Sequence, residues 1–358
     1  MRSWVSLDWL APARWRRGPP LRALDERPAL VHYTPSSILE NPEDRQFWYC
    51  DGRKRYATCS GVSWYHGDHL ACVNVLGNAI HAYRFDREVL RLIPVQALSG
   101  AASMVKPENI SFSPDGTLVA ITDMGAADMK ICRVDPHTHE ISLDGFALVN
   151  EKTDRTAHGV GFSRCGRFVA YTTVDKPGLI RLYRVEADAS EIRIEPFQVF
   201  INTLHPLVPK GIDFAADRSR VAICYAPNVS RKKVRDRRGR LEIRAFDPNR
   251  GIASEPLSIS SRLHAIRCPD DVRFFDGDTR VVLTQQGDDS ALVLAVDPAT
   301  SALGRGTQTL RNPVSRLSFP HGAGVSEDGR WVAITNYGDD KLGIYAVMTP
   351  SALATPGV

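Results

Sequence analysis

The sequence lacks the short motifs that identify several large enzyme classes. It contains no G-x-S-x-G nucleophile elbow, no P-loop, no G-x-G-x-x-G fingerprint and no H-E-x-x-H metalloprotease motif. Its cysteines form no C-x-x-C pair, so we expect neither a zinc ribbon nor a disulfide framework. Cys72, Cys132 and Cys224 fall in apolar strand-like runs, where a thiol acts as a small hydrophobic group. This cysteine usage favours a reducing compartment, and we predict the cytoplasm.

Long apolar runs are also missing. No stretch approaches the roughly 18 apolar residues that a membrane span needs, and the N-terminal region has no continuous apolar core typical of a signal peptide. Residues 1–28 are rich in arginine and proline and include Trp4, Trp9 and Trp15. We expect an irregular arm that packs on the main domain or is partly disordered, with contact to a membrane surface or a protein partner as the alternative. Residues 348–358 are expected to form a flexible tail.

A repeat of about fifty residues dominates the remaining sequence. Each copy has a short apolar strand, a turn, a second apolar strand, a polar break and a third strand. The first two strands and the turn read GVSWYHGDHLACVN, NISFSPDGTLVAITD, GVGFSRCGRFVAYTT, GIDFAADRSRVAICY, DVRFFDGDTRVVLTQ and GAGVSEDGRWVAITN. The equivalent anchor residues of these copies are Trp64, Phe112, Phe162, Phe214, Phe274 and Val325. This period and patterning predict an all-β protein, a β-propeller with one four-stranded blade per repeat.

The sixth copy ends after its third strand, near Val347, so its outer strand must come from elsewhere. Ala29–Tyr33 is the expected donor, because an uncovered third strand would leave a bare sheet edge. This predicts a domain over residues 29–347 with six blades closed by an N-terminal strand. A seventh, degenerate blade built from residues 29–58 is the alternative.

Polar residues occupy two equivalent positions in every copy. In a propeller, the start of the innermost strand and the end of the second strand lie at the same mouth of the central funnel. Four positions before the anchors lie Ser60, Glu108, His158, Lys210, Asp270 and His321. After the second strands lie Asn74, Asp123, Thr173, Tyr225, Gln285 and Asn336. The framework repeats while these positions differ from copy to copy, which predicts a functional site at this mouth. A funnel entrance that only tolerates polar residues is the alternative.

The fourth copy carries a basic insertion over residues 227–240. The insertion has a net charge of +6, while the whole chain has +4, so the rest of the chain is slightly acidic. Topology places this loop over the mouth, where Arg231 and Arg235 could hold an anion as arginine forks do. A solvated loop is an equally open interpretation. We expect no nucleic-acid partner, because the basic residues form no broad face with interleaved aromatics.

Two copies carry a likeness to a known family. KPENISFSPDGTLVAITDMGAADMKICRVD and FPHGAGVSEDGRWVAITNYGDDKLGIYAV resemble the repeats of the phosphogluconolactonase-like, or YVTN-type, propellers. The resemblance covers about residues 60–347. It implies a site at the same mouth, where histidine, arginine and carboxylate groups act on lactones or related cyclic acids. The polar residues after proline correspond to Glu108 and Asn109 in the second copy and to His321 and Gly322 in the sixth. The Arg-His pair common in the family is absent, and its members usually have seven blades.

These observations lead to an enzyme as the first hypothesis. The expected substrate is a small anionic molecule, such as a lactone or another cyclic or activated intermediate. His158 and His321 are the candidate general acids and bases, because imidazole titrates near neutral pH. Glu108 and Asp270 would orient them or bind a cation, and Lys210 with the basic loop would hold the anion.

Two further expectations concern metals and partners. Glu108, Asp270 and Asp123, with Asn74 or Asn336, could bind calcium or another hard cation. His137 and His139 should lie on the opposite face, as part of an exposed turn rather than a metal site. The rival hypothesis for the whole chain is a non-catalytic propeller scaffold for protein partners.

Overall fold

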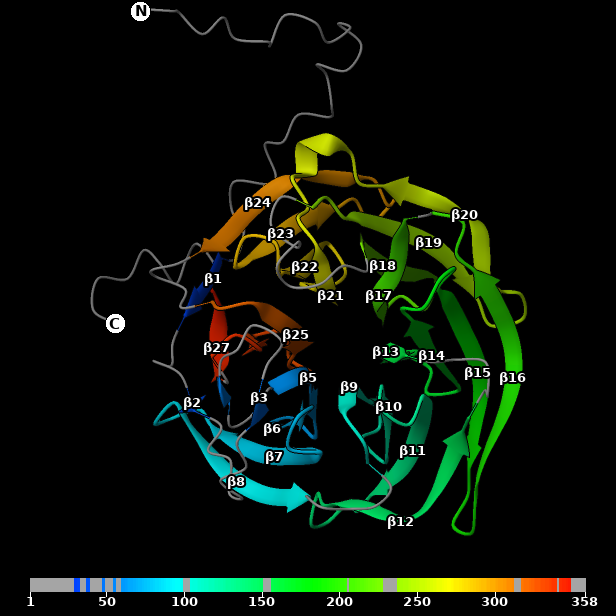
Figure 1. Cartoon of the computed structure of the whole chain (residues 1–358), viewed down its shortest axis with the longest axis vertical. Coiled ribbons are helices and arrows are strands. Elements are labelled where there is room, and N and C mark those ends of the chain that lie inside the picture. Colours follow the sequence, from blue (N-terminus) through cyan, green and yellow to red (C-terminus); the bar gives the residue numbers. More distant parts are fainter. Residues whose placement is uncertain are drawn as a thin grey trace, which may run out of the picture.

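The chain forms a ring of β-sheets around a central axis (Figure 1). The computed structural model describes residues 29–32, 37–38, 47–48, 54–55, 59–98, 104–150, 156–204, 206–227, 237–311, 317–339 and 341–348. The expected arm over residues 1–28 lies outside these ranges, as does the tail beyond Met348. Six sheets of four or five antiparallel strands make this a six-bladed β-propeller, as the repeat predicts.

Five blades each consist of four consecutive strands that run from the axis to the rim. The first is formed by β5 (Cys59–Tyr65), β6 (His69–Asn74), β7 (Ala79–Asp86) and β8 (Arg91–Leu98). The second is formed by β9 (Pro107–Phe112), β10 (Leu118–Asp123), β11 (Asp128–Val134) and β12 (Ile141–Val149). The third is formed by β13 (Ala157–Phe162), β14 (Phe168–Thr173), β15 (Leu179–Ala187) and β16 (Ile192–Ile201).

The fourth and fifth blades follow the same order. The fourth is formed by β17 (Leu207–Phe214), β18 (Arg220–Pro227), β19 (Arg240–Asp247) and β20 (Gly251–Ile259). A 3₁₀ turn, η5 (Arg262–His264), leads into the fifth. The fifth is formed by β21 (Pro269–Phe275), β22 (Arg280–Gln285), β23 (Ser290–Val296) and β24 (Leu303–Arg311).

The sixth blade takes its outer strand from the beginning of the chain. It contains β25 (Pro320–Val325), β26 (Trp331–Asn336) and β27 (Lys341–Met348), and β1 (Ala29–His32) pairs with β27 in antiparallel register. The short β2 (Ser37–Ile38) also pairs with β27. The expected donor strand is therefore confirmed for its described part. Of the region proposed for a seventh blade, the structure describes only β1, β2 and a two-residue pair, β3 (Phe47–Trp48) with β4 (Lys54–Arg55).

The hydrophobic core lies between neighbouring blades rather than inside a single layer. Apolar residues of each sheet face the next sheet, and every gap holds a buried cluster. Between the first two blades the rings of Tyr65 and Phe112 stack with centroids 4.0 Å apart. Between the sixth and first blades, Phe85 packs edge-on against Trp331. Because each blade buries its faces only against its neighbours, the ring has to be closed.

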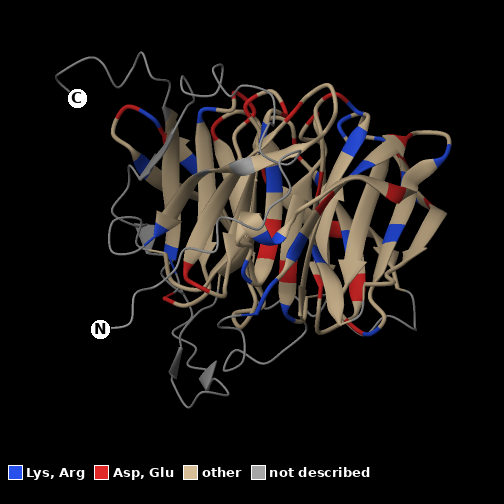
Figure 2. Ribbon diagram, turned by 90° about the horizontal axis from the view of Figure 1, so that it is seen from above, with Lys and Arg blue, Asp and Glu red and all other residues tan. Residues whose placement is uncertain are grey.

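The turns between the first and second strands of the repeats are stabilised by their own side chains. In the second blade, the Ser113 hydroxyl accepts from the Leu118 N–H at 2.9 Å and donates to Asp115 at 2.6 Å. In the sixth blade, Ser326 and Asp328 form the equivalent pair at 2.6 Å. Gly116 completes the second-blade turn with a φ of +71°, a left-handed conformation that favours glycine. Seen edge-on, the disc carries interspersed positive and negative residues along both edges (Figure 2).

Three histidines meet on the face opposite the predicted mouth. His66 and His69 flank the first turn of the first blade, and His139 lies on an outer turn of the second blade, beyond the exposed His137. The His139 ring lies 4.5 Å from the His66 ring and 4.4 Å from the His69 ring. The turn that carries His137 and His139 is on the expected face, but only His137 is exposed, because His139 packs against the imidazoles of His66 and His69. Burial, with the charges of the neighbouring imidazoles, lowers the pKa of both His69 and His139 below the ordinary value of 6.5.

The first prediction follows from this histidine cluster. Near pH 6.5, His69 and His139 bind protons more readily in the unfolded chain than in the folded protein, because folding lowers their pKa values. The free energy of unfolding should therefore fall as the pH falls through 6.5. His139→Gln should reduce the fall, measured by urea unfolding across this pH range. His137→Gln, on the same turn, is the matched control and should keep the wild-type dependence. An unchanged pH profile in His139→Gln would contradict the assignment.

The second prediction concerns ring closure. Deleting residues 1–35 removes β1 and uncovers the edge of β27, so the protein should aggregate or lose several degrees of melting temperature. Deleting residues 1–28 leaves β1 in place, and the difference between the two truncations isolates the strand. Equal melting temperatures and a monomeric state for both proteins would show that β1 does not close the ring.

Candidate active site

The six polar residues near the start of the inner strands converge on the axis, as the repeat predicts. Five of them come from the inner strands of the first, second, third, fifth and sixth blades and are almost fully buried, and Lys210, from the fourth, is 15% exposed at its side chain. We call these residues the central cluster: Ser60, Glu108, His158, Lys210, Asp270 and His321. Residues about fifty positions apart in the chain thus become direct neighbours.

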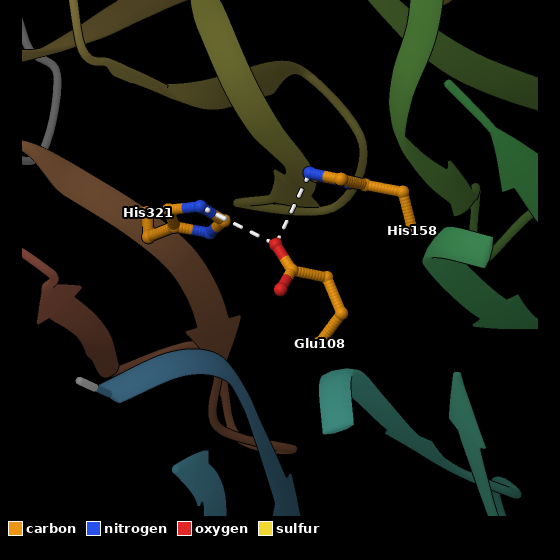
Figure 3. Close-up of side chains that lie close together, drawn as sticks. All are labelled: Glu108, His158 and His321. Atoms are coloured by element: carbon orange, nitrogen blue, oxygen red, sulfur yellow. Dashed lines mark ion pairs between the residues drawn. The ribbon is translucent and has the colours of Figure 1, made fainter. Parts of the chain in front are cut away.

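Glu108 lies between the two imidazoles (Figure 3). Its Oε1 atom is 3.2 Å from Nε2 of His158 and 3.4 Å from Nε2 of His321. The two rings are nearly parallel, with centroids 5.7 Å apart. Glu108 Oε2 is buried and has no hydrogen-bond partner among the described residues. The arrangement therefore leaves one carboxylate oxygen available for an additional group.

Asp270 holds the other side of His321. Its Oδ2 atom is 2.6 Å from His321 Nδ1, and the Ser60 hydroxyl is 2.9 Å from the same nitrogen. An Nδ1–H that donates to Asp270 leaves Nε2 directed at Glu108. The ring also stacks on Tyr337, with centroids 5.0 Å apart. These contacts fix the position and the orientation of the His321 ring.

Lys210 links the remaining members. Its ammonium group is 3.0 Å from His158 Nε2 and 3.4 Å from Asp270 Oδ1. It is the member of the central cluster with the most exposed side chain. Lysine presents a compact positive charge that suits a carboxylate or a phosphate.

The cluster separates the pKa values of its two histidines. Burial, together with the Lys210 charge, holds the pKa of His158 well below its ordinary value, so this imidazole is neutral. Burial acts the same way on His321, but Asp270 and Glu108 outweigh it and raise the pKa of His321. Opposite shifts in two neighbouring imidazoles are typical of acid–base sites.

The carboxylates are also unequal. Burial alone would raise the pKa of Asp270, but the charges of His321 and Lys210 outweigh it and lower the pKa, so this group is ionised. For Glu108, burial dominates, and with repulsion from Asp270 it raises the pKa. Lys210 stays charged, because the two carboxylates overcome the effect of burial and raise its pKa.

Threonine hydroxyls position this cluster. In the second blade, Thr122 Oγ1 accepts from the Asn109 N–H of its own blade and donates to the carbonyl of His158 in the next blade. Thr172 makes the same pair of bonds with Gly159 and with the carbonyl of Lys210. Thr284 and Thr335 repeat this arrangement toward His321 and Ser60. The sequence shows the underlying repeat, since these threonines end the VAIT-like second strands, but their bridging role depends on the spacing of the blades.

Glycines allow the inner strands to approach each other beside the cluster. A Cβ atom on Gly159 would lie 2.1 Å from the carbonyl oxygen of Lys210, and one on Gly322 would lie 2.5 Å from the carbonyl oxygen of Ser60. Both clashes are with backbone atoms, which cannot rotate away. Glycine at these positions therefore sets how closely the central side chains can meet.

The second polar set predicted from the sequence is buried, but its described hydrogen bonds go mainly to loop backbone. Asp123 accepts from the N–H groups of Val105, Gly125 and Ala126 and also contacts Lys130. The side-chain oxygens of four others likewise accept backbone N–H groups; these are Asn74, Thr173, Gln285 and Asn336. Tyr225 lies beside the ion pair of Glu242 and Arg244. These residues support the loops behind the central cluster, and their binding of a substrate stays a prediction.

Arg231 and Arg235 of the basic insertion lie outside the described residues, so their binding of an anion stays a prediction.

Tyr337, which stacks on His321, was missed by the sequence reasoning because it lies in a loop beyond the repeated positions. Its only signal is its place directly after Asn336. None of the described cysteines forms a disulfide.

Comparisons with known proteins support the architecture. No protein-family model matches the chain, and no curated protein matches its sequence. A matching crystal structure from Bacteroides uniformis, named a "putative 6-phosphogluconolactonase", has a TM-score of 0.56 and 13% identity and covers 90% of this chain and 92% of its own. A chain of a nidogen/laminin complex matches with a TM-score of 0.49 and 13% identity, over 74% of this chain and 84% of its own. At such identities the first likeness shows the propeller fold alone. No described helix has the length and apolar character that crossing a membrane requires.

The third prediction tests the close approach of the inner strands. Gly159→Ala places a methyl group against a backbone carbonyl and should destabilise the protein by about 1–3 kcal/mol, the usual effect of overpacking. Gly306→Ala in β24 is the control, because its nearest neighbour is the movable Leu292 side chain at 3.1 Å. Urea unfolding of both variants measures the difference. Equal stabilities would mean that the inner strands can separate without loss.

Proposed function

We propose that the protein is an enzyme that acts on a small anionic metabolite at the central cluster. The proposed substrate class is a lactone or a related cyclic or activated acid. One observation carries the proposal: five ionisable side chains from five blades are in mutual contact, four of them buried and Lys210 15% exposed. Burying charged groups is unfavourable even when they are paired, and an apolar plug would close the axis at least as well. Such clusters of perturbed groups are typical of functional sites.

The contacts favour distinct roles for the residues. His321, oriented by Asp270, is the first candidate for proton transfer, and His158 is the second. Lys210 would bind the acidic group of the substrate. In lactone hydrolysis, water would add to the carbonyl carbon, the bond to the ring oxygen would break, and an imidazole would deliver the proton to that oxygen. The name of the Bacteroides uniformis relative agrees with this substrate class, although the likeness is too distant to assign it.

A non-catalytic scaffold is the second candidate, and a separate observation favours it. Large apolar side chains are exposed near the ends of three neighbouring outer strands and on the turn that follows the third. They are Leu148, Val199, Ile201, Leu257, Ile259 and Leu263. Exposed apolar groups of this kind can mark a surface for a protein partner. The two candidates differ in where substitutions should matter, because these side chains lie on the rim and the central cluster lies on the axis.

The fourth prediction separates the candidates. Purified protein should turn over at least one member of a panel of acidic lactones and activated acid esters. His321→Gln, which keeps a polar partner for Asp270, should lower the turnover rate by about 10²–10⁴-fold, the usual contribution of general acid–base catalysis. Lys210→Met should mainly raise KM. His137→Gln on the opposite face is the control. Turnover that survives His321→Gln unchanged would remove the cluster from the chemistry.

A further inference from the structure

We propose that Glu108, His158 and His321 bind one divalent transition-metal ion, of the kind represented by Zn²⁺. The inference concerns the same cluster as the proposed enzyme activity, but it depends on the donor geometry and would stand without catalysis. With an ion bound, His158 and His321 would serve as ligands in place of the proton-transfer roles proposed above. Ligand atoms from these three residues all lie within 4.8 Å of one another. They are held by three separate blades, so the site exists only in the closed ring.

The donor separations suit a small coordination sphere. Glu108 Oε1 lies 3.2 Å and 3.4 Å from the Nε2 atoms of His158 and His321. Zinc binds imidazole nitrogen and carboxylate oxygen at about 2.0–2.2 Å, so tetrahedral ligands are about 3.3–3.5 Å apart. In Figure 3 both imidazole nitrogens are directed toward the same carboxylate oxygen. The donor atoms of the two imidazoles lie within 4.8 Å of each other, so binding an ion requires side-chain shifts that draw the donors together.

The surroundings of His321 match those of a metal-bound histidine. A ligating imidazole usually donates its other N–H to a carboxylate, which fixes the tautomer and strengthens the metal bond. His321 has this arrangement, because its Nδ1 atom is 2.6 Å from Asp270 Oδ2 while Nε2 faces Glu108. Asp270 would therefore be a positioning residue for the metal ligand.

An unpartnered oxygen provides an independent reason for a bound cation. Glu108 Oε2 is buried and has no hydrogen-bond partner among the described residues. A buried carboxylate oxygen without a partner is unfavourable, and a divalent ion would compensate it. Glu108 can offer this oxygen to the ion in addition to Oε1.

The donor types favour a transition metal over calcium. Two imidazole nitrogens and one carboxylate suit zinc, iron, cobalt or nickel, whereas calcium takes six to eight oxygen ligands. Three of the residues expected from the sequence for a calcium site direct their oxygens to other partners. Asp123 accepts three backbone N–H groups, and the amide oxygens of Asn74 and Asn336 accept those of Gly77 and Ser318.

Lys210 would compete with the ion. Its ammonium group is 3.0 Å from His158 Nε2, the atom that would bind the metal, and Asp270 Oδ1 is 3.4 Å from the same group. Metal binding would require Lys210 to leave His158, and Asp270 or an anionic ligand could then pair with it. The internal cation should therefore weaken metal affinity in the wild-type protein.

Calorimetric titration of chelator-treated full-length protein with Zn²⁺, Co²⁺ and Ca²⁺ tests the proposal. We expect one Zn²⁺ per chain, a cobalt spectrum typical of low coordination, and weaker binding of Ca²⁺. His158→Gln and Glu108→Gln should each lower zinc affinity by at least tenfold, and Asp270→Asn by about 10–100-fold, as for other partners of metal-bound histidines. Lys210→Met should bind zinc more tightly than the wild type. His137→Gln should leave the affinity unchanged.

Each outcome bears on the proposal in a defined way. Tighter binding by Lys210→Met cannot result from misfolding, so it supports the site even if a ligand variant is unstable. Absence of zinc binding by the folded wild type, unchanged affinity in His158→Gln and Glu108→Gln, or a preference for Ca²⁺ would overturn it. Zinc binding without turnover would leave the metal site standing and count against the enzyme. Full turnover by chelator-treated protein that binds no zinc would support the enzyme activity and contradict the metal site.

Discussion

A threonine hydroxyl shared between neighbouring blades is the interaction on which this structure most depends. Thr122, Thr172, Thr284 and Thr335 each accept an N–H of their own blade and donate to a carbonyl of the next. The accepting carbonyls belong to residues of the central cluster. Because the bonds are buried, water cannot replace them, and losing one would leave polar backbone atoms unpaired. The same bond thus sets the blade spacing and places the side chain that the next blade contributes to the axis.

The charged groups of the central cluster are paired with one another. Asp270 contacts both His321 and Lys210, while Glu108 lies between the two imidazoles. An anion could compete with the carboxylates for Lys210, and a cation could compete with Lys210 for His158. The proposed anion binding and the proposed metal binding therefore depend on the same physical property. The buried charges are paired with one another, and an external ion could replace one partner in a pair.

The repeat in the sequence predicted the architecture and which residues meet on the axis. Asn336 pairs with Pro320, the residue before His321, and Asp123 pairs with Pro107, the residue before Glu108. This register places the start of the inner strand beside the end of the second strand, as the repeat predicts. Closure by Ala29–His32 followed from an incomplete last copy. Side-chain directions could not be predicted in this way. The sequence grouped Asp123 with the site, but its carboxylate turns to loop amides. The contacts of Tyr337 and of His66 with His139 depend on how neighbouring blades stack, which periodicity does not encode.

The central claim is that side chains from different blades form one electrostatically coupled cluster on the axis. A double-mutant cycle with Asp270→Asn and His321→Gln tests it most directly, with unfolding free energies measured in urea. The pair is 2.6 Å apart across two blades, so we expect a coupling energy of about 0.5–3 kcal/mol. Asp270→Asn combined with His137→Gln, on the opposite face, should be additive. Additive effects for Asp270 and His321 as well would contradict the account.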